Sequence, residues 1–190
     1  LRATTSARPS GRDVIVLLAL GVLGNGIYQM LFLGSVANTD VGVAALLLAS
    51  SPAFIALLSR FAGLGTISPR CALGIALSLV GVAIIAFTSR VSLDGSSSME
   101  GNVLAVVAAI IWAVYVVLQA RFVPNVEDSM VAALTLTGGA LPLLLFGLPS
   151  IVATHWASLP KGALMAIVFS GLISLALASV FWYRGVRILG

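Results

Sequence analysis

The sequence predicts an all-α fold: a polytopic membrane helix bundle with six membrane-spanning segments. Hydrophobic residues make up 60% of the 190 residues, charged residues make up 8%, and the mean hydropathy is +1.16. A water-soluble domain carries about a quarter charged residues, so this class is excluded. The charges leave six uncharged stretches, each long enough to cross about 30 Å of hydrocarbon as a helix. These stretches are Val14 to Thr39, Val41 to Ser59, Cys71 to Ser89, Gly101 to Ala120, Ser129 to Pro160 and Gly162 to Tyr183.

The basic residues predict how the spans are oriented, because Lys and Arg in short loops stay on the cytoplasmic side of a membrane. When the loops are placed alternately on two sides, one side receives only Arg90 and Lys161. The other side receives Arg2, Arg8, Arg12, Arg60, Arg70, Arg121, Arg184 and Arg187. We therefore expect a multi-pass protein of a bacterial inner (plasma) membrane with both chain ends in the cytoplasm. The same placement accounts for the net charge of +4 without a nucleic-acid partner.

Short breaker sequences separate the first three spans. Asn38 to Asp40 predict a tight turn after the first span, and a stretch rich in glycine, serine and proline follows Arg60. Pro52 lies in the middle of the second span, where it is expected to act either as a hinge or as a static kink, because proline leaves a backbone carbonyl free. The expected spans are residues 14–37, 41–60 and 71–89.

A polar loop at residues 90–100 divides the chain into two halves, residues 1–89 and 101–190. In the second half, Gly139 and Pro142 are expected to break the fifth span, again as a hinge or a static kink. His155 belongs to an interfacial loop and has no expected role. Trp156 and Trp182 are expected in aromatic belts at opposite faces of the bilayer. The expected spans of this half are residues 101–121, 129–148 and 162–187.

Neutral polar and aromatic side chains share one face on each of three spans. Lipid cannot satisfy their amide groups, so these faces are expected to point into the bundle and to line a path for a small-molecule substrate. The same residues could instead hold helices together, and the sequence leaves both interpretations open. They are Asn25, Tyr28, Gln29 and Phe32 on the first span, Trp112, Tyr115 and Gln119 on the fourth, and Ser170 and Ser174 on the sixth.

Groups for catalysis or metal binding are missing from the spans. The uncharged stretches contain no carboxylate, and no nucleophile elbow or zinc-binding helix motif occurs in the chain. Cys71 is the single cysteine, which excludes an intrachain disulfide and a cysteine metal cluster. We therefore expect no catalytic residue, no metal and no cofactor, and we expect that the protein is not an enzyme.

The order of several short motifs resembles the EamA family of the drug/metabolite transporter superfamily. One departure is that Gly65 and Thr66 stand where the family commonly has a Gly-Glu pair. The motifs that carry the resemblance are LFLGSVANT (31–39), SSPAFIALL (50–58), LGIALSLVGVAIIAF (73–87), AAIIWAVYVV (108–117) and FWYRGVRILG (181–190).

The resemblance implies a ten-helix fold built from two five-helix repeats of opposite orientation. The chain would then be a fragment that covers helices three to eight, a reading that its start on Leu1 also favours. Gly34 and Gly185 would occupy matching places in the two repeats. The implied function is transport, in the export direction, of a small metabolite such as an amino acid or a related organic solute, by alternating access. The alternatives are an intramembrane lipid-modifying enzyme with its catalytic residues on absent helices, and a non-transporting membrane scaffold. Substrate, coupling ion and oligomeric state are not predicted.

Overall fold

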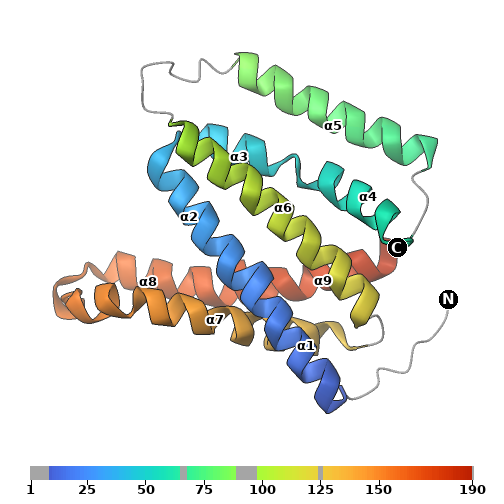
Figure 1. Cartoon of the computed structure of the whole chain (residues 1–190). Helices are drawn as coiled ribbons and strands as arrows, with labels where there is room; N and C mark the ends of the chain where they lie inside the picture. Colours follow the sequence, from blue (N-terminus) through green and yellow to red (C-terminus); the bar gives the residue numbers. More distant parts are fainter. Residues whose placement is uncertain (1–8, 65–67, 89–97, 124–125, 190) are drawn as a thin grey trace.

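The structure is a computed structural model that describes residues 9–64, 68–88, 98–123 and 126–189. Its long helices run between two faces of the molecule, and the start of α1 and the end of α9 lie at the same face (Figure 1). In chain order, the elements are α1 (Gly11–Gly21), the π-helix η1 (Val22–Ile27), α2 (Tyr28–Asn38), α3 (Val41–Leu48), α4 (Ser51–Phe61), α5 (Pro69–Thr88), α6 (Met99–Phe122), α7 (Asp128–Ala153), the 3-10 helix η2 (Trp156–Ser158), α8 (Lys161–Phe169), the π-helix η3 (Ser170–Leu177) and α9 (Ala178–Leu189).

Within the part of the chain that the structure describes, five helices are long and apolar enough to cross a membrane, which confirms the polytopic helical bundle. Four of them contain an expected span in full, and Lys161–Trp182 overlaps the last one, which is expected to run to residue 187. The remaining expected span corresponds to α5, a helix of 20 residues. Its apolar part within the described residues, Ala72–Gly81, is shorter than a membrane span. The five helices are Gly11–Asn38, Val41–Phe61, Met99–Phe122, Asp128–Ala153 and Lys161–Trp182.

Side chains that the sequence places at the helix starts cap them. Ser10 and Asp13 form a reciprocal capping box at α1. Asp40 accepts hydrogen bonds from the backbone amides of Gly42 and Val43 at 2.8 and 3.3 Å, so it ends the turn and begins α3. Oxygens of this kind satisfy amides that have no partner within the helix. The tight turn at Asn38 to Asp40 is therefore where the sequence predicts it.

The second span is interrupted where its sequence turns polar. The helix stops at Ala49 and Ser50 and restarts as α4, with Pro52 in its first turn. Proline is tolerated there because the amides of a first turn have no partner within the helix. The hydroxyl of Ser51 donates to the carbonyl of Leu48 across the break.

The fifth span extends further than the sequence indicates. Its helix α7 continues from the expected end at residue 148, through Pro149, to Ala153. A proline inside a membrane helix removes one backbone hydrogen bond, and the surrounding helix tolerates this loss. Thr154 ends the helix, with its hydroxyl donating to the carbonyl of Ser150 at 2.7 Å. The loop around His155 is correspondingly shorter than expected.

Helix α6 lies at the centre of the bundle. It packs against α2, α3 and α4, whereas α7 packs against α1 and η1. Elements from the two expected halves therefore interleave and do not form separate bundles. Most of the loop expected at residues 90–100 lies outside the described residues. Small side chains let the helices approach α6 closely, and four of them are fully buried: Ala105, Ala108, Ala109 and Ala113.

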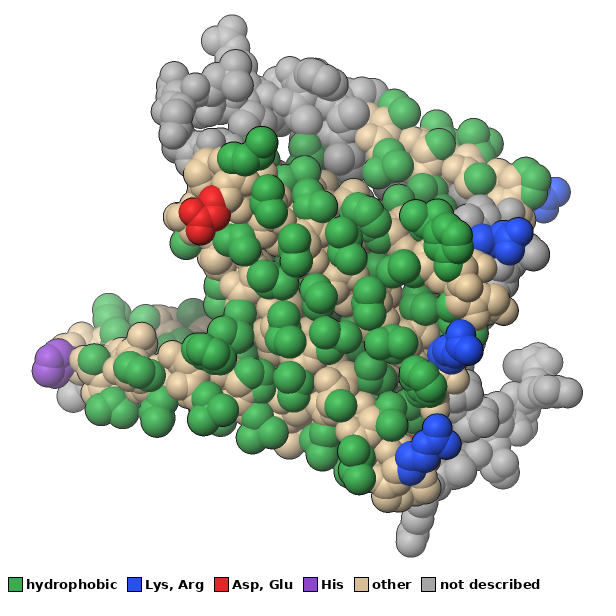
Figure 2. Space-filling model, viewed as in Figure 1, with side chains coloured by type: hydrophobic (Ala, Val, Ile, Leu, Met, Phe, Trp, Pro, Cys, Tyr) green, Lys and Arg blue, Asp and Glu red, His purple; other side chains and the backbone are tan. Residues whose placement is uncertain are grey.

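Charged side chains gather at opposite ends of the helices. Arg12 lies in the first turn of α1, Arg60 in the last turn of α4, Arg70 in the first turn of α5 and Arg121 in the last turn of α6. Figure 2 shows blue side chains along one edge of the molecule, with red and purple ones at the opposite side. Arginines that are far apart in the sequence thus come to one end of the bundle, as the alternating placement of loops requires.

Ser35 on α2 is fully buried, and its hydroxyl has no hydrogen-bond partner among the described residues. We expect Ser35→Ala to raise the thermal stability of the purified protein by about 1 kcal/mol or more, because the change removes a desolvated polar group that gains nothing in return. Ser51→Ala is the matched control, since its hydroxyl is bonded and its removal is expected to lower stability. Equal shifts for the two variants in a thermal unfolding assay would contradict this account.

Candidate substrate site

Asn25 lies in η1, the π-helical segment in the middle of the first membrane-spanning helix. A π-turn is wider than an α-turn, and such segments often occur at functional sites. The Nδ2 atom of Asn25 is buried and has no hydrogen-bond partner among the described residues. An amide donor in this state costs about 1–3 kcal/mol. Asn25 therefore carries a buried donor that no described residue satisfies.

Three close contacts hold η1 in place. A Cβ atom added at Gly24 would lie 2.4 Å from the ring of Tyr115, and one added at Gly26 would lie 2.4 Å from Cγ of Pro142. A Cβ atom added at Gly139 would lie 2.4 Å from Cβ of Asn25. The structure thus places Asn25 against Gly139 and its neighbour Gly26 against Pro142, two residues that the sequence marks as a helix break, although α7 itself is continuous there. Because Pro142 has no backbone N–H, the carbonyl of Gly138 lacks its usual i+4 donor.

An aromatic cluster lies on the elements next to η1. The ring centroids of Tyr28 and Phe32 on α2 are 6.3 Å apart and stacked. The Trp112 ring on α6 lies 5.1 Å from Tyr28 and 5.3 Å from Tyr115. These separations are typical of attractive ring pairs, which contribute about 0.5–1.5 kcal/mol beyond their burial. Four of the nine predicted site residues therefore form one contiguous group around Trp112.

Trp182 is the fifth member of this cluster and the one that the sequence reasoning missed. Its ring lies 6.1 Å from that of Trp112 and so contacts the cluster, whereas the sequence indicates only a place in an aromatic belt. The signal was present, since a spacing of four residues from Ser170 through Ser174 continues to Trp182. The ring remains 46% exposed. Trp182 adds a third helix, α9, to the site.

Among the described residues, no ring contact joins the remaining predicted residues to the aromatic cluster. Gln29 on α2 and Gln119 on α6 are half-buried. Ser170 is exposed, and its hydroxyl donates to the carbonyl of Ile167 on its own helix at 3.4 Å. Ser174 lies in η3, and its side chain is outside the described residues.

The two π-helical segments occupy corresponding positions if the implied equivalence of Gly34 and Gly185 holds. The offset of 151 residues (185 minus 34) moves η1 from residues 22–27 onto residues 173–178. This range overlaps η3, which covers Ser170–Leu177. Each of the two spans would then carry a widened turn at the same place along its length.

Hydrogen bonds join the elements around the site at both ends of α6. At the end that is poor in arginine, the carbonyl of Asn38 accepts from the amide and hydroxyl of Ser98 at 3.0 and 2.7 Å, and Thr39 Oγ1 donates to Asn102 Oδ1 at 2.8 Å. At the opposite end, Arg121 Nη1 donates to the carbonyl at residue 62, just past α4, at 3.1 Å. These bonds tie α6 to α2 and α4.

The described residues hold no group of three or more His, Cys, Asp or Glu side chains that could bind a metal ion. Two grooves lie elsewhere, one between α1–η1 and α6 and one along α8 and η3. Neither groove is lined by any of the nine predicted residues. The chemistry available at the cluster is therefore hydrogen bonding through amides and contact with ring faces.

Comparison with known proteins identifies the family. The model of the EamA-like transporter family matches residues 2–87 and 99–190. The chain is 32% identical over 165 residues to the uncharacterized transporter YdfC of Bacillus subtilis (strain 168), covering 87% of this chain and 52% of that protein. It is 28% identical over 178 residues to an uncharacterized transporter of Archaeoglobus fulgidus, covering 93% of this chain and 60% of that protein.

A third relative, the uncharacterized transporter YyaM of Bacillus subtilis (strain 168), is 23% identical over 180 residues and is covered over 59% of its length. The chain thus spans a little more than half the length of these curated relatives. No solved structure matches it. The family model covers most of the chain and both sides of the loop between the halves, and the chain therefore belongs to the EamA-like transporter family.

Proposed function

We propose that the protein is a carrier that exports a small organic solute, such as an amino acid or a related metabolite, across a bacterial inner membrane. The observation that carries the proposal is the buried Nδ2 atom of Asn25, which has no hydrogen-bond partner among the described residues, in a segment whose Gly24 packs on Tyr115, one of a cluster of five aromatic rings. Membership of a transporter family supports the general activity.

The amide nitrogen of Asn25 requires an acceptor, and a carboxylate or carbonyl oxygen of a solute is one. Ring faces at Tyr28, Trp112 and Trp182 offer flat apolar surfaces to the rest of the molecule. Small-molecule sites commonly combine apolar walls with a few placed polar groups in this way. The combination of an amide donor with ring faces favours a solute that has an oxygen acceptor at one end and an apolar or flat part at the other.

Alternating access is the mechanism that these features favour. The break at Ala49 and Ser50, the two π-helical segments and Pro142 are places where a helix can bend with little loss of backbone bonding. Because hydrogen bonds tie α6 to α2 and α4, we propose that these helices move as one unit against α7, α8 and α9. Pro52, Gly139 and Pro142 would serve as the flexible points.

The arginine-rich end of the bundle is proposed to face the cytoplasm. Four described arginines, at the ends of α1, α4, α5 and α6, lie at this end. Short loops with basic residues are retained on the cytoplasmic side. The start of α1 and the end of α9 would then both face the cytoplasm.

For the test, the complete reading frame that contains residues 1–190 is expressed. Solutes that accumulate outside overexpressing cells are identified, and the flux of each is then measured in inside-out membrane vesicles. We expect Asn25→Leu to reduce this flux at least tenfold, because the variant keeps the side-chain volume and removes the amide. Thr137→Val is the control, since that exposed hydroxyl bonds only the carbonyl of Ala133 on its own helix. Wild-type flux in Asn25→Leu at normal abundance would refute the site, and the absence of any exported solute would refute the function.

A further inference from the structure

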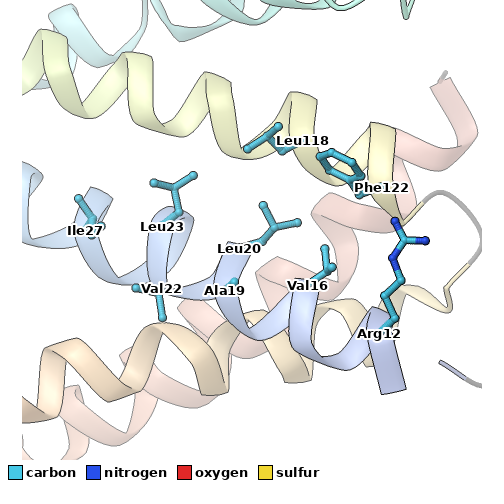
Figure 3. A pocket seen from close by; sticks show the side chains of 9 residues that line it. All are labelled: Arg12, Val16, Ala19, Leu20, Val22, Leu23, Ile27, Leu118 and Phe122. Carbon is cyan, nitrogen blue, oxygen red and sulfur yellow. The ribbon is translucent and has the colours of Figure 1, made fainter. Parts of the chain in front are cut away.

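The groove between α1–η1 and α6 has the form of a site for an amphipathic molecule. Its volume is about 460 Å³. Aliphatic and aromatic side chains from both helices line it, and Arg12 is the only charged residue among them. Figure 3 shows Leu20, Leu23 and Leu118 along its length and Arg12 at one end, with the Arg12 side chain extending toward Phe122. We propose that this groove binds one anionic phospholipid, with the phosphate at Arg12 and an acyl chain along the apolar part.

The charge at the mouth of the groove favours an anion. Among the described residues, the Arg12 guanidinium forms no hydrogen bond or ion pair. Hydrogen bonds from Ser10 lower the pKa of the adjacent Asp13 carboxyl, and the charge of Arg12 is one of the lesser causes that lower it. The adjacent carboxylate of Asp13 is occupied, because Oδ2 accepts from the amide and the hydroxyl of Ser10, both at 2.9 Å. Arg121, on the last turn of α6, donates to a backbone carbonyl. A guanidinium pairs with phosphate through two parallel hydrogen bonds, which gives such contacts both strength and direction.

The length of the groove fits one leaflet of a bilayer. Val16 and Ile27, at the two ends of its apolar lining, are separated by 11 residues, or about 16 Å at the rise of a helix. Half of the hydrocarbon core is about 15 Å. Arg12 lies one turn before Val16, at the depth of the headgroups. One acyl chain beside the lining would therefore reach from the interface to the bilayer midplane.

The surroundings favour an anionic headgroup over a neutral one. Figure 2 shows Lys and Arg side chains gathered at the same end of the molecule. Basic residues near a leaflet that contains anionic lipid each contribute about 1 kcal/mol of attraction. The positive electrostatic potential of these basic residues raises the local concentration of anionic lipid. The direct contact with Arg12 then holds one lipid molecule in the groove. None of the five rings of the aromatic cluster lines the groove, although both involve η1, and the proposal does not depend on the proposed transport function.

Native mass spectrometry of the detergent-purified protein, titrated with phosphatidylglycerol or phosphatidylcholine, tests the proposal. We expect one phosphatidylglycerol to bind at least tenfold more tightly than phosphatidylcholine, and we expect this preference to weaken at high ionic strength. Arg12→Gln is expected to abolish the preference. Arg70→Gln, at the start of α5 on the same side but outside the groove, is expected to retain it.

A second pair of variants tests whether the lipid lies in the groove. Ala19 is exposed and lines the groove, so Ala19→Trp is expected to prevent binding by filling it. Ile15→Trp, on an exposed position of the same helix outside the lining, is expected to leave binding unchanged. Equal losses in Arg12→Gln and Arg70→Gln would mean that only the general field attracts lipid, and would overturn the proposal. Tight binding in Ala19→Trp, or no bound phospholipid in the wild type because a protein segment fills the groove, would also overturn it.

Discussion

Gly138→Ala is expected to destabilise the protein by about 1–3 kcal/mol, because α1 and α7 cross in direct backbone contact at this residue. A Cβ atom at Gly138 would lie 2.2 Å from the carbonyl oxygen of Leu18 and 2.9 Å from its carbonyl carbon. Both atoms belong to the backbone, so no side-chain rotation relieves the clash, and the two helices must move apart. Alanine favours a helix by about 1 kcal/mol over glycine, which offsets only part of the loss.

The measurement for Gly138→Ala is the temperature at which the detergent-purified protein loses its monodisperse peak in size-exclusion chromatography. Gly147→Ala is the matched control on the same helix, because its Cβ atom would meet only Cδ1 of Ile151 at 3.7 Å. It gains helix propensity without a clash, so its stability should stay equal or rise. Indistinguishable melting temperatures for the two variants would show that the crossing is not as tight as the structure places it.

The crossing of α1 and α7 depends on reciprocal glycine contacts. On the opposite helix, a Cβ atom at Gly21 would lie 2.2 Å from the carbonyl oxygen of Thr135. Without a difference in hydrophobicity between lipid and helix, association in a membrane depends on close packing, and small residues allow it. The close approach at Gly21 and Gly138 therefore helps to fix the position of η1, and with it that of Asn25.

The membrane spans were predictable because the free-energy cost of placing a charged side chain in hydrocarbon depends on that side chain and not on residues far away in the sequence. Five expected spans overlap long apolar helices, and the turn at Asn38 to Asp40 falls where the sequence indicates it. The fifth span was less accurate, since Pro149 suggests an end in water-soluble proteins but is tolerated in a membrane helix. Local composition therefore predicts which segment forms a long apolar helix, but it predicts the end of that helix less accurately.

The arrangement of the helices was not predictable because it depends on pairs of distant residues. The sequence marks Gly139 as part of a helix break, whereas the structure shows it within a continuous helix and in contact with Asn25. Trp182 is followed closely by Arg184, which indicates an interfacial position, but its ring meets Trp112 from another helix. The π-helical segments leave no signature in residue spacing. The residues of the candidate site stay a prediction from the sequence, and the structure adds which of them contact one another.

Trp112→Ala is expected to abolish transport and to lower stability, because Trp112 is the central ring of the cluster. Its ring contacts Tyr28, Tyr115 and Trp182, which come from α2, α6 and α9. Tyr115 is fully buried beneath η1, so a cavity left by the tryptophan would also loosen the segment that carries Asn25. Truncation of a buried aromatic residue costs about 3–5 kcal/mol, and the partial exposure of Trp112 places it at or below the lower end of this range.

Trp112→Phe and Trp156→Phe separate the role in transport from the role in packing. Phenylalanine keeps a ring face at position 112, so we expect Trp112→Phe to retain most of the stability and a measurable flux. Trp156 is exposed in the loop after α7, with Nε1 donating to the carbonyl of Ile151 at 2.9 Å, and its replacement should leave flux unchanged. Flux is measured in vesicles and normalised to the amount of folded protein. If Trp112→Ala transported at the wild-type rate after this correction, the ring cluster would serve packing alone, and the substrate path would have to lie on other residues.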